Sequence, residues 1–159
     1  MSVDLTRLPD VWTDETLFAD DLTAGDVFEL GSYTVSTDEL TGFAAHWDPQ
    51  FFHVDRDAAD RGLFGGLIAS GIHTMAVFQR LSVAGFWERS ATIAARGIRD
   101  VRFVRPVRPE STLTGRLLVE GVRHRDGRSL VTVRGALATD TGEAVLEMIV
   151  DAYLARRPA

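Results

Sequence analysis

Cysteine and lysine are both absent from this chain of 159 residues. Without cysteine, the protein can have no disulfide, no thiolate metal ligand and no cysteine nucleophile. All 17 basic residues are arginines, which excludes a Schiff-base lysine and the lysine of a Walker-type phosphate loop. Any catalysis therefore rests on carboxylates, imidazoles and backbone N–H groups.

Long apolar runs and an excess of positive charge are also missing. The longest nearly uncharged run, residues 63–79, is interrupted by glycines and is shorter than the roughly 20 apolar residues that span a bilayer. The net charge of −6 argues against a general nucleic-acid binder. Residues 1–15 carry acidic side chains where a secretory signal peptide has an apolar stretch. We therefore expect a cytoplasmic protein that binds neither nucleic acid nor a membrane.

The composition that remains, 45% apolar and 25% charged, is typical of one globular domain. Apolar periodicity predicts strands at 26–35, 97–104, 112–123, 129–139 and 143–154, and helices at 36–47 and 71–84. Residues 48–66 are expected to be mostly loop, with a helical turn near 57–61. Residues 1–25 are expected to form a lead-in with a short helix near 14–18, and residues 26–159 the domain.

Each of the two helices has a capping residue at its start. Ser36 and Glu39 have the spacing of a capping box, and Ser70 stands where it can cap the second helix. One apolar face of the first helix is formed by Leu40, Phe43, Ala44 and Trp47. The second helix is apolar on most sides, which predicts burial within the domain.

The order of elements indicates an α+β fold in which a strongly curved antiparallel sheet wraps around one central helix. A single sheet of this kind leaves its edge strands open. Pairing two sheets side by side covers an edge, so we expect a homodimer, with a higher oligomer as the alternative.

The first candidates for chemistry are Asp48 and His53, which lie five residues apart in a loop that begins where Pro49 ends a helix. A tight loop can bring both side chains to one water molecule, where one removes a proton and the other orients the water or returns the proton. The alternative is structural: Asp48 caps a turn, and His53 is a surface residue.

The second candidate is Gly71, at the start of the second predicted helix. A helix N-terminus presents unpaired N–H groups and the positive end of the helix dipole, and glycine has no side chain to block a ligand. The Gly71 N–H can then hold a carbonyl oxygen that becomes negative in a transition state. The alternative is that Ser70 and Gly71 only cap and pack the helix. Together, the two candidates suit the addition of water next to a thioester carbonyl.

The runs FAAHWDPQFFHVDRDAA, FGGLIASGIHTMA and IRDVRFVRPVRPESTLTG resemble the MaoC-like dehydratases, the (R)-specific enoyl-CoA hydratases of the hotdog fold. The resemblance covers about residues 26–154. It implies that Asp48 and His53 are the catalytic pair and that the Gly71 N–H holds the thioester carbonyl. It also implies a trans-2-enoyl-CoA and an (R)-3-hydroxyacyl-CoA as the substrate pair.

Some residues depart from the family's pattern. Trp47 stands in place of the usual glycine before the aspartate, and Gln50 and Phe51 in place of the usual asparagine and proline. Trp47 and Phe51 are expected to narrow the site or change the geometry of its loop, which puts the size of the substrate in question. We count Ser70, Trp47, Phe51 and His73 as candidate substrate-binding residues.

Four arginines, Arg99, Arg102, Arg105 and Arg108, recur every three residues. In a strand this spacing alternates between faces, which favours a solvated or dimer-edge surface. One or two of them could instead bind the phosphates of a coenzyme A or carrier-protein arm.

No pair of residues has metal-ligand spacing, since His46 and His53 fall on different predicted elements. We expect no metal and no cofactor, with coenzyme A entering only as part of the substrate. Two other functions remain open: a hotdog acyl-CoA thioesterase, and a non-catalytic subunit that binds an acyl-CoA or a partner chain.

Overall fold

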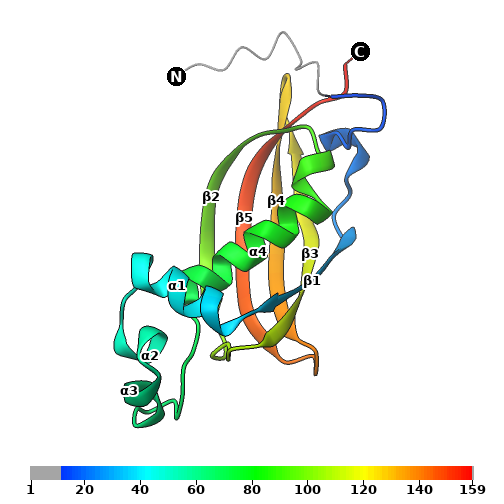
Figure 1. Ribbon diagram of the computed structural model, residues 1–159. Coiled ribbons are helices and arrows are strands. Elements are labelled where there is room, and N and C mark those ends of the chain that lie inside the picture. Colours follow the sequence, from blue (N-terminus) through cyan, green and yellow to red (C-terminus); the bar gives the residue numbers. More distant parts are fainter. Residues whose placement is uncertain (1–11, 159) are drawn as a thin grey trace.

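The computed structural model describes residues 12–158, which form one curved sheet around one long helix (Figure 1). The strands are β1 (Val27–Val35), β2 (Thr92–Phe103), β3 (Ser111–His124), β4 (Arg128–Thr139) and β5 (Ala144–Ala155). The α-helices are α1 (Thr37–Trp47), α2 (Phe51–Val54), α3 (Arg56–Asp60) and α4 (Gly71–Gly85), and two short 3-10 helices are η1 (Ala19–Asp21) and η2 (Trp87–Arg89).

The sheet is antiparallel throughout, in the order β1-β3-β4-β5-β2. Figure 1 shows α4 lying across its concave face, with α1, α2 and α3 beyond one end of α4. The α+β class and the central helix are confirmed. The tight turns predicted between β3, β4 and β5 are present, and each contains a glycine with positive φ: Gly127 at 72° and Gly142 at 84°.

The core lies between α4 and the sheet. On α4, the buried side chains Val77, Phe78 and Leu81 face the strands. Phe78 packs directly on the backbone of β4, because a Cβ atom built on Gly135 would stand only 2.2 Å from the Phe78 ring. Glycine at position 135 therefore sets how closely α4 approaches the sheet.

The burial within the domain that is predicted for α4 holds on the side that faces the sheet. The outer face of the helix is open, with Ile72 55% and Val83 39% exposed. The reason is that the sheet covers only one side of the helix. The apolar face predicted for α1 is likewise incomplete, since Leu40 and Ala44 are buried while Trp47 is 75% exposed.

The N-terminal prediction also needs correction. Residues 14–18 form a turn and a single bridge from Leu17 to Ser90 rather than a helix, and the short helix follows as η1. Ala19 and Leu22 then join the main core. Residues 1–11 of the predicted lead-in lie outside the described residues, and a boundary at residue 25 stays a prediction.

The segment expected to be mostly loop contains two short helices, of which α3 confirms the helical turn predicted near 57–61. α2 and α3 occupy much of residues 48–66, and the Asp55 side chain caps α3 by accepting a hydrogen bond from the Ala58 N–H at 2.9 Å. The short apolar turn at α2 was missed because four residues are too few to establish a helical period.

β2 is an edge strand and is mostly exposed. Its pairing with β5 is interrupted by three register shifts, and Asp100 adopts a positive φ of 53°. Such bulges weaken an edge as a template for uncontrolled pairing. None of the helices in residues 12–158 is both long and apolar enough to cross a membrane.

Candidate active site

The end of α1 and the start of α4 bring the predicted residues together. Asp48 caps the C-terminus of α1, and its backbone N–H donates to the Ala44 carbonyl at 2.9 Å. His53 lies on α2, immediately after the turn that follows Pro49. Gly71 is the first residue of α4, with Ser70 as its N-cap. Three separate elements therefore converge on one place.

His53 is buried, with 4% of its surface exposed, so the alternative that it is a surface residue is wrong. Its Nδ1 lies 2.7 Å from the Ile68 carbonyl oxygen. A carbonyl oxygen only accepts hydrogen bonds, so Nδ1 carries the proton in this contact. In the neutral imidazole, Nε2 is then left with a free lone pair. This is the state that can accept a proton.

Both carboxylate oxygens of Asp48 accept hydrogen bonds. The Gln50 Nε2 donates to Oδ1 at 2.9 Å, and the Ser70 hydroxyl donates to Oδ2 at 2.7 Å. The His53 Nε2 is 3.4 Å from the same Oδ2. The hydrogen bond from Gln50, then that from Ser70, lowers the pKa of Asp48 below its ordinary value, and the charge of His53 adds a smaller effect. The carboxylate is therefore ionised at neutral pH.

Position 71 requires glycine because the Phe103 ring lies close to its backbone. A Cβ atom built on it would stand 2.6 Å from the Phe103 Cζ. As the first residue of α4, Gly71 also has an N–H without an acceptor inside the helix. Glycine at position 71 therefore lets the Phe103 ring pack directly against the start of α4, in the lining of the pocket described below.

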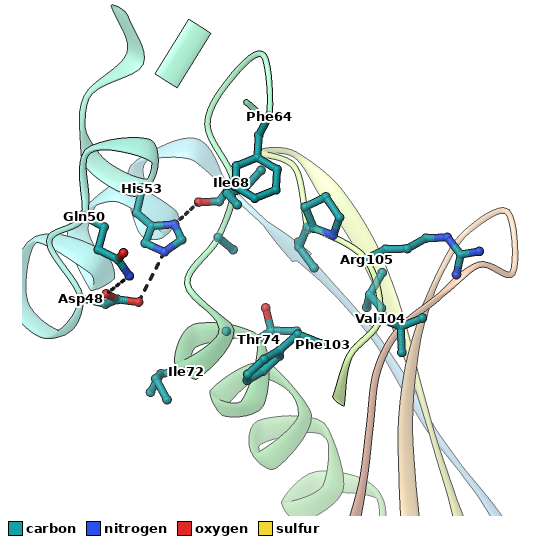
Figure 2. A pocket seen from close by; sticks show the side chains of 15 residues that line it. Asp48, Gln50, His53, Phe64, Ile68, Ile72, Thr74, Phe103, Val104 and Arg105 are labelled. Carbon is teal, nitrogen blue, oxygen red and sulfur yellow. Dashed lines mark hydrogen bonds and ion pairs between the residues drawn. The ribbon is translucent and has the colours of Figure 1, made fainter. Parts of the chain in front are cut away.

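A pocket of about 420 Å³ joins these groups. Figure 2 shows Asp48, Gln50 and His53 on one side and Arg105 on the other. Apolar side chains form most of the wall between them, from Phe64, Ile68, Ile72, Phe103, Val104, Pro106, Val107 and Val145. The pocket thus pairs a polar end, suited to proton transfer, with an apolar wall, suited to an acyl chain.

Comparisons with known proteins identify the family of this chain. The family model described as "MaoC like domain" matches residues 22–141, well over half of the chain. The chain belongs to the MaoC-like domain family. The 3-hydroxyacyl-thioester dehydratase Z of Mycobacterium tuberculosis is 32% identical to it over 128 residues, which are 79% of this chain and 77% of that protein.

Solved structures of MaoC-like proteins have the same fold. The MaoC-like dehydratase from Rhodospirillum rubrum is 34% identical, with a TM-score of 0.82 over 90% of this chain and 99% of that one. An R-hydratase from Pseudomonas aeruginosa has a TM-score of 0.70 at 22% identity, over 91% of this chain and 92% of that one. The hotdog fold expected from the resemblance is confirmed.

Within this MaoC-like chain, not every predicted residue reaches the pocket. Asp48, His53 and Gly71 line it. Ser70 is not among the lining residues, but its hydroxyl donates a hydrogen bond to Asp48. Trp47 and Phe51 are 75% and 51% exposed and are not among the lining residues. In the single chain they do not narrow the site. Their role in binding substrate stays a prediction.

His73 and His46 lie elsewhere. His73 lines a second hollow, between α1, β1 and α4. His46 is exposed on α1, with Nδ1 3.1 Å from the Gly42 carbonyl. Across residues 12–158, no three histidine, aspartate or glutamate side chains group as metal ligands.

Two groups of the site were not assigned a role from the sequence. Gln50 appeared only as a departure from the family's pattern, yet its amide binds Asp48. The Ile68 carbonyl fixes the tautomer of His53. The position of Gln50 in the motif was a usable signal for its role, whereas the role of the Ile68 backbone carbonyl leaves no signal in a sequence.

Proposed function

We propose that this protein is a hydratase or dehydratase of acyl thioesters, which adds water to a trans-2-enoyl thioester to give the (R)-3-hydroxyacyl thioester, or catalyses the reverse. The observation that carries the proposal is the convergence of Asp48 Oδ2 and the His53 Nε2, 3.4 Å apart, at the wall of a pocket that also contains Gly71. Membership of the MaoC-like family supports it.

The reaction follows from the hydrogen-bonding capacity of the pair. The Asp48 carboxylate and the free lone pair of His53 both accept, so one water molecule donates a hydrogen bond to each. As the water oxygen bonds to C3, one of its protons passes to His53. The electrons of the C2–C3 double bond move toward the thioester carbonyl oxygen, which the Gly71 N–H stabilises. The proton on His53 then goes to C2, and one molecule of water has been added.

His53 is the proton acceptor in this scheme because of how Asp48 is held. Two hydrogen-bond donors and a lowered pKa make the Asp48 carboxylate a weak base. Its negative charge beside Nε2 instead stabilises the imidazolium that forms during the reaction. Asp48 therefore orients the water and supports the charge of His53.

The thioester is carried by coenzyme A or by a carrier protein. Arg105, at the far side of the pocket from the dyad, stands where a phosphate of either carrier can be bound. No cofactor enters the proposed reaction, because water, an imidazole and a backbone N–H supply all of its steps.

We also propose that two copies of the chain form a homodimer along β2, the exposed edge strand. The expected result in analytical ultracentrifugation is a particle of twice the 17.5 kDa chain mass. A monomer across the concentration range would contradict the proposal, and a higher oligomer would require a second interface.

The test of the proposed function is the loss of the conjugated thioester absorbance of crotonyl-CoA and longer trans-2-enoyl-CoAs. His53→Asn is expected to lower kcat at least a hundredfold, the usual range for removing a general acid–base group. Asp48→Asn is expected to lower kcat comparably, because the water loses the carboxylate that orients it and the imidazolium loses its countercharge. Asp57→Asn and His46→Asn make matched changes at exposed positions outside the pocket lining and are expected to retain the wild-type rate.

A thiol reagent in a parallel assay separates the alternatives. Hydration releases no free coenzyme A, whereas a thioesterase releases one thiol for each substrate consumed, against no background from this cysteine-free chain. If enoyl-CoAs of every acyl length tested bind but none is converted, the protein is instead a non-catalytic subunit. Full activity of His53→Asn would refute the role given to His53.

A further inference from the structure

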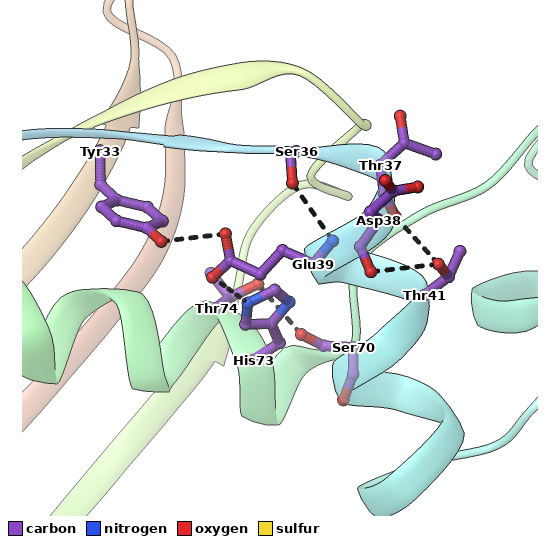
Figure 3. Close-up of polar contacts among 9 residues, drawn as sticks. All are labelled: Tyr33, Ser36, Thr37, Asp38, Glu39, Thr41, Ser70, His73 and Thr74. Carbon is purple, nitrogen blue, oxygen red and sulfur yellow. Dashed lines mark hydrogen bonds and ion pairs between the residues drawn. The ribbon is translucent and has the colours of Figure 1, made fainter.

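A second carboxylate–imidazole pair lies between α1 and α4, outside the pocket lining. Figure 3 shows Glu39 of α1 between Tyr33 of β1 and His73 of α4. The Tyr33 hydroxyl donates to Glu39 Oε2 at 2.9 Å, and the His73 Nε2 is 3.2 Å from Glu39 Oε1. The His73 ring stacks on Phe43, with centroids 4.5 Å apart and planes within 9°. One carboxylate thus ties three elements together.

A histidine at position 73 carries a cost in folding stability. Only 3% of it is exposed, and its Nδ1 is buried without a hydrogen-bond partner among the described residues. A buried polar atom without a partner costs about 1–3 kcal/mol. An apolar ring would stack on Phe43 without this cost. The contact of the His73 Nε2 with the Glu39 carboxylate is therefore what offsets this cost at position 73.

Glu39 and His73 lie on the same two helices as the groups at Asp48 and Ser70. Glu39 and Asp48 are on the same helix, with Asp48 as its C-cap, and nine residues of helix place them about 13 Å apart along the axis. His73 and Ser70 are likewise at the start of α4. Two polar contacts join the two helices, from Glu39 to His73 and from Asp48 to Ser70, and the stack of Phe43 on His73 adds an apolar one. One contact alone would let α1 pivot about it, whereas two fix its direction.

We propose that Glu39 and His73 are positioning residues, which hold α1 against α4 so that Asp48 stays in register with His53 and the Gly71 N–H. This inference rests on the proposed function. Neither residue lines the catalytic pocket, so neither touches the substrate. Displacing a reacting group by about 1 Å can cost a hundredfold in rate, and the second contact prevents such a displacement.

The kinetic test uses Glu39→Ala and His73→Phe, with Glu39→Gln as the conservative variant. His73→Phe keeps the stack on Phe43, and it removes both the unpartnered nitrogen and the contact with Glu39, whose effects on stability oppose one another. The variant is therefore expected to fold and yet to lower kcat about tenfold or more. KM is expected to stay within twofold in both variants, because the pocket wall is untouched. Glu39→Gln, which retains an acceptor oxygen, is expected to recover most of the rate.

Arg80→Ala is the matched control. Arg80 lies on the same hollow, with its guanidinium 5.2 Å from the centre of the Tyr33 ring, and makes no part of the contact between the helices. It is expected to leave kcat unchanged. If Glu39→Ala and His73→Phe also keep kcat within twofold of wild type, the positioning role is refuted.

A measurement without substrate keeps this inference separate from the proposed function. The titration of Asp48 can be followed by the NMR signal of its carboxyl carbon in protein labelled with 13C-aspartate. The Asp48→Asn variant identifies this signal. Loss of the Glu39 charge alone would lower the pKa of Asp48, whereas a loosened hydrogen bond from Ser70 raises it. We expect a rise in Glu39→Ala and His73→Phe. An unchanged or lower pKa would overturn the inference, and an inactive wild type with the expected rise would overturn only the proposed reaction.

Discussion

At the scale of single residues, the site depends on how each polar atom of Asp48 and His53 is partnered. Gln50 and Ser70 occupy both carboxylate oxygens, and the Ile68 carbonyl holds the His53 Nδ1. The His53 Nε2, 3.4 Å from Asp48 Oδ2, is then free to accept a hydrogen bond, and each carboxylate oxygen retains a second lone pair for water. The chemistry of the pair is therefore decided by its neighbours as much as by the two residues themselves.

Gln50→Leu tests this dependence. The change removes the donor that contributes most to lowering the pKa of Asp48, so the Asp48 pKa is expected to rise toward its ordinary value. The carboxylate also loses one of its two anchors, and kcat is expected to fall on the order of tenfold. NMR titration of 13C-aspartate and steady-state hydration rates measure the two effects. An unchanged Asp48 pKa in Gln50→Leu would show that the hydrogen bond from Gln50 does not lower it.

The sequence predicts Asp48, His53 and Gly71 as one site, because their spacing reflects where helices stop and start, and the structure brings all three to one pocket. For His73 the sequence was insufficient. The sequence places His73 two residues beyond Gly71, which suggested the same pocket, but residues two apart do not share a helix face. Its side chain is on the α1 side, in the second hollow.

At the scale of elements, the fold is controlled by a few close approaches between α4 and the sheet. Periodicity predicted the five strands and the two long helices to within a few residues, except at the start of β2, which begins at Thr92 rather than at residue 97. Ala94, Ala95 and Gly97 are weak strand formers, so only the pairing with β5 reveals this part of the strand.

Gly135→Ala tests the closest of these approaches. The new methyl group would overlap the Phe78 ring, and the free energy of unfolding is expected to fall by about 1–3 kcal/mol, as for other overpacked cores. Urea denaturation measures it. Gly121→Ala is the matched control, since a Cβ there meets nothing within 4 Å, and it is expected to be neutral within about 0.5 kcal/mol.

Adding Phe78→Leu to Gly135→Ala gives a further check. The shorter side chain makes room for the methyl group, so the double variant is expected to be more stable than the sum of the two single changes predicts. Strict additivity would mean that Gly135 and Phe78 do not constrain one another.

At the scale of the whole molecule, ion pairs tie the two ends of the described chain together. Arg156 contacts Asp20, and Arg157 contacts Asp21, at 2.7 Å each. Figure 1 shows that residues near 20 and the C-terminal end of β5 lie at the same end of the sheet. No pattern in the sequence indicates this pairing, because residues 136 apart are brought together only by the complete sheet.

Asp20→Asn is expected to destabilise the protein in a pH-dependent way. The side chain of Arg156 is the main cause that lowers the pKa of Asp20 from 3.8 to about 2. A lowered pKa contributes stability above the unfolded value, and this contribution is lost as the pH falls through the folded value. At pH 7 the loss in Asp20→Asn is expected to be about 1 kcal/mol, since solvent screens the pair.

Denaturation of wild type and Asp20→Asn across a pH series measures this linkage. The difference in the free energy of unfolding is expected to be constant above about pH 5 and to narrow as the pH falls toward 2. A difference that persists unchanged in acid would mean that the contact acts through packing and not through charge.

The most direct test of the central claim is mass spectrometry of the product formed from crotonyl-CoA in 18O-labelled water. The account predicts an intact thioester, heavier than the substrate by one molecule of labelled water, with the label in an (R)-3-hydroxyl group. This product is expected from wild type and to be strongly reduced with His53→Asn. Labelled crotonate together with free coenzyme A, or no conversion of crotonyl-CoA and longer enoyl-CoAs, would contradict the claim.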